Sequence, residues 1–504
     1  MTPFSLLAPA IARDVLDHAL ALGADFAELF VERKRRSQLS LLSSQIENIS
    51  GGLDFGIGVR LCYGHKVLYG YTNLASRDEL LRIVSLLAAK DRRDPVVTAT
   101  AFDFSRLSDR NPVALPLSAD KLLEQKIAYL HAMDAAARAE STKVSQFAGN
   151  VLGWEQEVEI FNSEGVQVSD RRHYNRIMAQ TIAALGSEQS VGYEAPGAMM
   201  GWEHAAGVDP RELALTATRQ ALVKLGAAPC PSGKLPVIME SGFGGVIFHE
   251  ACGHLLETTS VAKKASVFHD KMGQLIANPA VSAVDEGLQG NAWGSINVDD
   301  EGMAAQHTQL IKDGVLTGFL VDRMGALRTG YARTGSGRRE SYKFAPASRM
   351  RNTYIEPGNH SLDEMLATVE HGIYAKRMGG GSVQPGTGEF NFNVQEAYLI
   401  EGGKITRPLK SATLIGTGPQ VLKEISMVGR DLALSAGMCG SVSGSIPASV
   451  GQPPLKVDNI LVGGMPDEPT RHEPTACPPA GPGRRSRCRS GHYRQPGQGL
   501  LPQG

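Results

Sequence analysis

The sequence has little cysteine, little net charge and no long apolar run, and each shortage excludes a class of protein. Six cysteines are scattered over 504 residues, so we expect no disulfide framework and a reducing, cytoplasmic environment. A formal net charge of −1 provides no basic surface of the kind that binds nucleic acid. No apolar stretch approaches the ~20 residues that cross a membrane, and residues 1–28 lack a basic leader. We therefore expect neither a nucleic-acid partner nor a membrane partner.

Three stretches of different composition divide the chain. Residues 1–230 combine helical periodicity with long alternating patterns, which predict an N-terminal α+β domain with helices packed on an antiparallel sheet. Residues 231–464 are Gly-rich with short strand patterns, which predict a strand-rich C-terminal domain. Residues 465–504 are rich in Pro, Gly and Arg and are predicted to be a disordered tail. The fold class is therefore predicted to be α+β.

Local patterns refine this division. In the first domain the order helix, strands, helix occurs twice, which indicates either an internal duplication or one sheet with paired helices. Ser76 is a predicted helix N-cap, with Glu79 at the capping-box position, and Ser118 is predicted to begin a long helix. In the second domain, residues 361–377 are predicted to form a helix that interrupts the strands.

The segment FHEACGHLLE, residues 248–257, holds two histidines and a glutamate in an order that suits metal chemistry. Imidazole is the usual zinc ligand, and a neighbouring carboxylate is the usual base. The spacing is H-E-x-x-x-H, which places His249 and His254 roughly 140° apart on a regular helix. A shared ion therefore requires a distortion, such as a π-type turn near Gly253. The alternative is an ordinary helix with one buried and one surface histidine.

A catalytic zinc takes three protein ligands and leaves one position open, so a third ligand is needed. Glu257 lies three residues after His254, and Cys439 lies between glycines that would let a thiolate approach an ion. Cys252, inside the motif, is interpreted as a packed residue. Residue types alone leave the choice open, and the other candidates are His269, His307, Asp299, Asp300 and Glu301.

Three further segments carry polar or Gly-rich patterns. GSINVDDEG, residues 294–302, is either a calcium or magnesium loop or a polar turn. RTGSGRRES, residues 333–341, is either a cradle for a substrate carboxylate or a solvated loop. RMGGGSVQPGTGEFNF, residues 377–392, has glycines that would let an extended peptide approach a strand edge.

Together with the histidine motif and the segment MCGSVSGSIPASVGQPPLKVDNILVGG, these stretches resemble the TldD/PmbA family, and its TldD-like catalytic branch in particular. The resemblance runs in family order over residues 235–464. It implies a zinc-dependent peptidase in which His249, His254 and Cys439 bind Zn2+ and Glu250 is the catalytic base. It also implies that unfolded or extended peptides are hydrolysed inside the cavity of a dimer, either a homodimer or a heterodimer with an inactive homologue.

The sequence departs from the family pattern at one place. Family members commonly continue the Cys-Gly pair with Lys and then Gly-Gln, whereas residues 441–444 here are Ser-Val-Ser-Gly. The contacts of these four residues are the part that the resemblance does not predict. The alternative function is a non-catalytic peptide-binding or scaffold subunit of a family heterodimer, and the third ligand, Cys439, distinguishes the two functions.

Overall fold

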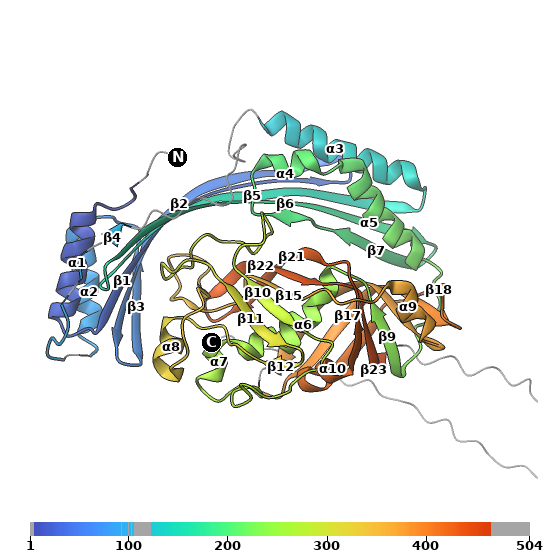
Figure 1. Ribbon diagram of the computed structural model, residues 1–504. Coiled ribbons are helices and arrows are strands. Elements are labelled where there is room, and N and C mark those ends of the chain that lie inside the picture. Colours follow the sequence, from blue (N-terminus) through green and yellow to red (C-terminus); the bar gives the residue numbers. More distant parts are fainter. Residues whose placement is uncertain are drawn as a thin grey trace, which may run out of the picture. The chain divides into compact units, whose positions relative to one another are not determined.

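A long antiparallel sheet forms the N-terminal half of the computed structural model (Figure 1). The structure describes residues 5–464, with the exception of residues 92, 99, 102, 105–121 and 385. For residues 103–104 it gives only the backbone. The described residues all fall within one compact unit. The predicted tail and Ser118 lie outside the described residues.

The first sheet has eight strands in the order β3-β2-β1-β5-β6-β4, with β7 and β8 also paired to β6. The two long hairpins lie side by side because β1 pairs with β5, so the repeated sequence pattern forms one sheet with paired helices. The strands are β1 (Phe26–Leu42), β2 (Gln45–Tyr63), β3 (Lys66–Thr72), β4 (Asp103–Phe104), β5 (Val144–Asn162), β6 (Val166–Leu185), β7 (Glu188–Glu194) and β8 (Gly197–Ala198).

Helices bury the apolar side chains of this sheet in two clusters. Helices α1 (Pro9–Ala21) and α2 (Arg77–Ala88) pack on β1 and β2 at one end. Helices α3 (Leu123–Glu140), α4 (Trp202–Gly207) and α5 (Pro210–Lys224) cover the other end, on the face away from the C-terminal strands (Figure 1). The predicted α+β class, with helices on an antiparallel sheet, is confirmed.

Helix α2 shows how local sequence sets an element boundary. The Ser76 hydroxyl accepts a hydrogen bond from the Glu79 backbone N–H at 3.4 Å, which satisfies one of the free donors of the first turn. The Glu79 carboxylate accepts from Arg82 at 2.7 Å rather than closing a capping box. The predicted N-cap is therefore confirmed, and the glutamate serves a surface ion pair.

Two sheets and a small two-stranded pair make up the C-terminal half. The seven-stranded sheet has the order β16-β9-β23-β19-β17-β18, with β20 on β23 and a further pairing of β16 with β17. It contains β9 (Gly233–Met239), β16 (His371–Gln384), β17 (Glu389–Glu401), β18 (Lys404–Leu409), β19 (Ala412–Thr417), β20 (Ile425–Val428) and β23 (Leu455–Gly463).

The six-stranded sheet has the order β12-β11-β10-β15-β22-β21, so β21 is an edge strand. It contains β10 (Ala283–Glu286), β11 (His307–Lys312), β12 (Val315–Leu316), β15 (Asn352–Ile355), β21 (Ala433–Ser441) and β22 (Gly444–Gln452). The separate pair is β13 (Gly337–Arg338) with β14 (Ala347–Ser348). Short helices connect the strands: α6 (Val246–Ala251), α7 (Thr258–Val261), α8 (Arg323–Thr329), α9 (Leu362–Ala367) and α10 (Gly418–Glu424).

The predicted helix over residues 361–377 is mostly wrong. Helix α9 ends at Ala367, and strand β16 begins at His371. The segment enters the sheet because Ile373 pairs in parallel with Val237 on β9 and antiparallel with Leu399 on β17. Long-range pairing of buried residues thus overrides the local helical pattern. Among the described residues, no helix is long and apolar enough to cross a bilayer.

Candidate metal centre

Three of the predicted site residues meet in the C-terminal half. The nitrogens of His249 and His254 and the sulfur of Cys439 all lie within 4.8 Å of one another. Cys439 Sγ is 3.2 Å from His249 Nε2 and 3.4 Å from His254 Nε2. Cys439 is 190 residues from His249 along the chain. Within the part of the chain that the structure describes, no other group of three such side chains is placed to hold an ion.

A break in the helix allows both histidines to face Cys439. Helix α6 ends at Ala251, Cys252 leaves helical geometry with φ −132° and ψ −54°, and a 3₁₀ helix continues over Gly253–Leu256. The expected π-type turn is therefore replaced by a change from α to 3₁₀ geometry. The two imidazole rings come within 5.0 Å of each other, centroid to centroid, with an angle of 87° between their planes.

Gly253 serves packing rather than backbone freedom. A Cβ at this position would lie 2.1 Å from the sulfur of Met350, so any side chain would push the turn away from its support. The helix itself is held between the two C-terminal sheets, because α6 contacts β16 and β17 of one and β15 and β22 of the other. The turn that carries His254 is thus fixed by close contact on both sides.

Arg349 anchors the strand that carries Cys439. Its Nη2 donates to the carbonyl of Cys439, and its Nη1 donates to Ser443 Oγ and to the Gly444 carbonyl, both at 2.9 Å. The residues that depart from the family pattern span the turn between β21 and β22, where Val442 is 72 % exposed and Ser443 is fully buried. The departure therefore includes a buried hydroxyl that binds the anchoring arginine. Sequence reasoning missed Arg349, because nothing near it in the chain marks its partners.

The charges of the cluster favour the metal-binding thiolate of Cys439 and the protonated form of His254, whose proton an ion would have to displace. Burial alone would raise the pKa of the Cys439 thiol, but the adjacent His249 and His254 hold it well below its ordinary value. Burial would lower the pKa of His254, but Glu257 and Cys439 raise it well above its ordinary value. The thiolate is the form of cysteine that binds metals.

Two carboxylates approach His254 from different sides. Glu250 Oε2 lies 3.8 Å from His254 Nε2, the nitrogen that also faces Cys439, and its side chain is partly exposed. Glu257 Oε1 lies 3.2 Å from Nδ1 of the same ring and 3.9 Å from Arg349 Nε. Glu257 is therefore at the back of the ring, whereas Glu250 is next to the cluster.

The donor set fits a zinc ion. Two imidazoles and a thiolate are typical zinc ligands, and they leave a fourth tetrahedral position open. Tetrahedral geometry with ordinary zinc bond lengths places nitrogen and sulfur ligands about 3.6 Å apart. The observed separations of 3.2 and 3.4 Å are close to that distance.

The other candidate ligands lie in hydrogen bonds elsewhere. His307 Nδ1 is 2.7 Å from Glu286, and His269 Nδ1 is 2.8 Å from the Ser266 carbonyl. Cys252 is fully buried, as expected for a packed residue, and burial raises the pKa of its thiol.

The carboxylates of GSINVDDEG do not form a cation site. Asp299, Asp300 and Glu301 are buried, and their oxygens accept hydrogen bonds from arginines and backbone N–H groups. Arg60 on β2 donates to Glu301 at 2.6 Å, and Arg172 on β6 donates to Asp300 at 2.7 Å. The segment is a buried turn that binds the first sheet to the C-terminal half.

The arginines of RTGSGRRES are used in the same way. Arg339 donates to Glu28 on β1 at 2.6 Å, and Arg338 donates to the carbonyls of Met350 and Pro447. Both side chains are buried. The segment is therefore neither an anion cradle nor a solvated loop, because its charges are committed inside the protein.

Known protein families and relatives match nearly the whole of this chain. Models of PmbA/TldA metallopeptidases match in three parts: domain 1 over residues 27–90, the central domain over 116–225 and the C-terminal domain over 232–464. A metalloprotease TldD homolog of Haemophilus influenzae is 36% identical over 476 residues, covering 92% of this chain and 98% of the relative. A zinc metalloprotease TldD homolog of Saccharolobus solfataricus is 24% identical over 450 residues, covering 88% and 97%.

Solved structures share the fold at low sequence identity. TldE from Thermococcus kodakarensis superimposes with a TM-score of 0.71 and 18% identity, over 90% of this chain and 100% of that one. A putative modulator of a DNA gyrase from Thermotoga maritima superimposes with a TM-score of 0.73 and 19% identity, over 90% and 99%.

Proposed function

The chain belongs to the PmbA/TldD metallopeptidase family, and we propose that it hydrolyses unfolded or extended peptides at a zinc ion held by His249, His254 and Cys439. The observation that carries this proposal is the convergence of the three ligand atoms within 4.8 Å from two distant segments. A scaffold subunit would have no need of such a donor set beside a partly exposed carboxylate.

In this proposal the chain's own residues position the reaction and move its proton. Bound zinc supplies a Lewis acid that polarises a carbonyl and lowers the pKa of water. Glu250 Oε2 accepts the proton of the attacking water and passes it to the leaving amine. Glu257 Oε1 lies 3.2 Å from Nδ1 of His254 and attracts a proton to that nitrogen, which leaves Nε2 of the ring as the ligand atom. Arg349 holds the backbone of Cys439 in place.

The remaining parts of the proposal concern substrate, assembly and location. An extended peptide suits the surroundings of Cys439, because β21 is a sheet edge. We propose a dimer with a cavity, formed with a second copy or an inactive homologue, and the likeness in fold to TldE supports a partner from the same family. Four described cysteines are free, which supports a cytoplasmic location. We retain domain boundaries at 1–230, 231–464 and 465–504.

Glu250→Gln tests the proposed base. The amide keeps the size of the side chain but cannot accept the proton, so we expect a loss of about 100-fold or more in kcat on an unfolded peptide. Zinc content, measured by elemental analysis, should stay at the parent's level. A matched variant, His254→Ala, should lose both zinc and activity. Full activity of the zinc-loaded Glu250→Gln protein would show that another group is the base.

A further inference from the structure

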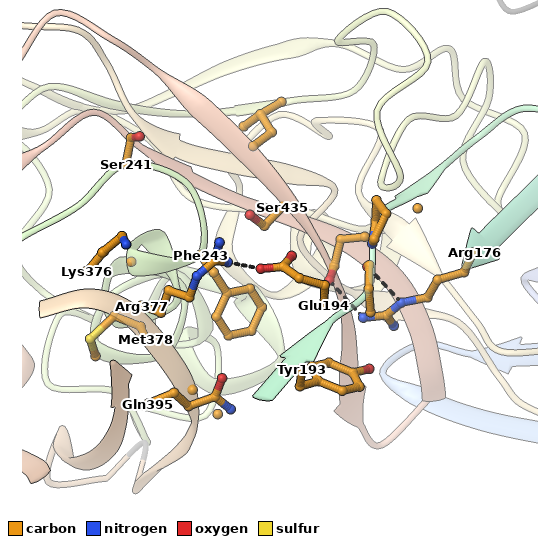
Figure 2. A pocket seen from close by; sticks show the side chains of 18 of the residues that line it. Arg176, Tyr193, Glu194, Ser241, Phe243, Lys376, Arg377, Met378, Gln395 and Ser435 are labelled. Atoms are coloured by element: carbon orange, nitrogen blue, oxygen red, sulfur yellow. Dashed lines mark hydrogen bonds and ion pairs between the residues drawn. The ribbon is translucent and has the colours of Figure 1, made fainter. Parts of the chain in front are cut away.

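A cavity of about 530 Å³ lies where the end of the first sheet meets β21 and β16 (Figure 2). Its wall includes Arg176 on β6, Glu194 at the end of β7, and Ser435 and Ala436 on β21. Lys376 and Arg377 on β16, with the glycines that follow them, form the opposite side. The Gly-rich segment that sequence analysis associated with peptide binding therefore borders this cavity.

Arg176 is a positive charge without a carboxylate partner among the residues that the structure describes. Its Nε donates to the Ala195 carbonyl at 3.3 Å, and its Nη2 donates to the Ala436 carbonyl at 3.2 Å. A guanidinium has five N–H donors, so three remain to be offered to a ligand. The half-buried position lowers the pKa of Arg176 below its ordinary value, but an arginine remains charged there.

The other charges around the cavity are paired with one another. Arg377 forms ion pairs with Glu194 and with Glu396, the latter at 3.4 Å. Lys376 pairs with Glu396 at 2.9 Å. Figure 2 shows Arg377 directed at Glu194, while Arg176 approaches from the other side. Three cations thus face two carboxylates, and the surplus positive charge belongs to Arg176.

The position of Arg176 relates the cavity to the candidate metal centre. Arg176 binds the carbonyl of Ala436, and Ala436 is three residues before Cys439 on the same strand. A strand rises about 3.3 Å per residue, so the two points are roughly 10 Å apart. An extended peptide that passes the metal centre alongside β21 would reach Arg176 about three residues from the bond to be cleaved.

We propose that Arg176 binds a carboxylate of the peptide substrate about three residues from the cleaved bond. The carboxylate is either the C-terminus of the peptide or the side chain of an aspartate or glutamate. The inference rests on the proposed function, because it names a preference of the same site. A planar carboxylate matches the fork of a guanidinium, and its single charge is repelled less by Glu194 and Glu396 than a phosphate would be.

The test uses one unstructured peptide in four forms. Its acidic side chains are kept or replaced by their amides, and its C-terminus is free or amidated. Binding is measured by fluorescence anisotropy with the zinc-loaded Glu250→Gln protein, and kcat/KM is measured with the parent. We expect the preferred carboxylate to tighten binding about 10- to 100-fold, as charge-assisted hydrogen bonds do. The peptide form that lacks this tighter binding shows whether the bound carboxylate is the C-terminus or an acidic side chain.

Substitution of Arg176 links the preference to this residue. Arg176→Met keeps the length of the side chain without its charge, and the preference for the carboxylate should fall to near unity. Arg176→Lys keeps the charge without the fork, so it should retain part of the preference, and it replaces the Met variant if that protein does not fold. Arg219→Met is the control that should keep the parent's preference, because this arginine is exposed on the outer face of α5 and pairs with Glu140.

Each outcome decides between the subsite and the reaction. A parent that binds or cleaves all four peptides equally would overturn the subsite and leave the peptidase proposal in place. A preference that persists in Arg176→Met would also overturn it. A parent that shows the preference in binding but cleaves no peptide with zinc bound would support the subsite and contradict the proposed function.

Discussion

Two buried clusters of ionisable side chains differ in what their atoms are bound to. Around Asp299–Glu301, arginines from the first sheet and backbone N–H groups hold the carboxylates. At the candidate metal centre, the Cys439 sulfur lies next to two imidazoles, and imidazole is a common metal ligand in proteins. Burial of charge therefore does not by itself identify a functional site. A cluster is structural when its lone pairs are committed to the protein, and it is a candidate site when its donor atoms point at one another.

The strongest test of this difference removes a cation from the structural cluster. Arg60 is buried between Glu28, at 2.5 Å, and Glu301, at 2.6 Å. Arg60→Met removes the cation shared by two buried carboxylates and leaves them with only their remaining arginine partners, so we expect the free energy of unfolding to fall by about 3–5 kcal/mol. Urea unfolding measures the loss. Zinc content of the protein that remains folded should equal the parent's, because Arg60 does not touch the candidate ligands.

An exposed arginine provides the control for this variant. Arg82 pairs with Glu79 at 2.7 Å on the surface of α2, and its side chain is 59% exposed. Arg82→Met should leave the urea midpoint of unfolding close to the parent's, because exposed ion pairs on a helix contribute little to stability. If the free energy of unfolding fell by less than about 1 kcal/mol in Arg60→Met, Arg60 would not have the structural role proposed here. If this variant lost zinc while its stability stayed intact, the cluster around Asp299–Glu301 would be part of the metal site.

A smaller effect is expected at the boundary between the two kinds of cluster. Glu257 Oε1 lies 3.2 Å from Nδ1 of His254 and 3.9 Å from Nε of Arg349, so Glu257 supports the candidate metal centre from behind the ring. Glu257→Gln keeps an acceptor there but removes the charge, and zinc affinity should fall about 10- to 100-fold. Competition with a chromophoric chelator at fixed pH measures the affinity. Glu250→Gln should keep the parent's affinity. An unchanged affinity in Glu257→Gln would assign Glu257 to the structural class.

Much of the fold could be predicted because its signals are local. Alternation over long stretches predicted the strands of the first sheet, and the Ser76 N-cap predicted the beginning of α2. The helix predicted over 361–377 was mostly wrong because the pairing of Ile373 with β9 and β17 depends on residues far away in the chain. The proposed domain boundaries remain a prediction.

The site was predictable only in part. Residue types marked His249, Glu250 and His254, but the third ligand stayed open until the family resemblance selected Cys439. The structure brings Cys439 to both histidines, while the roles of all four residues remain predictions. Arg339 was interpreted as part of either an anion cradle or a solvated loop, yet its partner Glu28 is 311 residues away. Pairing over such a distance leaves no trace in the local sequence.

The smallest predicted effect is a pH dependence in the structural cluster. Burial, and then the nearby Glu301, raise the pKa of Asp322 from 3.8 to about 6. A carboxyl with a raised pKa holds its proton more tightly in the folded protein, so the stability it contributes is lost as pH rises from about 4 to 6. Asp322→Asn keeps the acceptor that caps α8 and should remove this loss, because the amide does not titrate in this range. Urea unfolding at about pH 4.5 and about pH 7.5 measures the change in the free energy of unfolding with pH. The control is Asp78→Asn, because the Asp78 side chain is 98% exposed. If the stability of the parent and of Asp322→Asn changed with pH in the same way, Asp322 would have the same pKa in the folded and the unfolded protein. Its ionised form would then not destabilise the buried cluster.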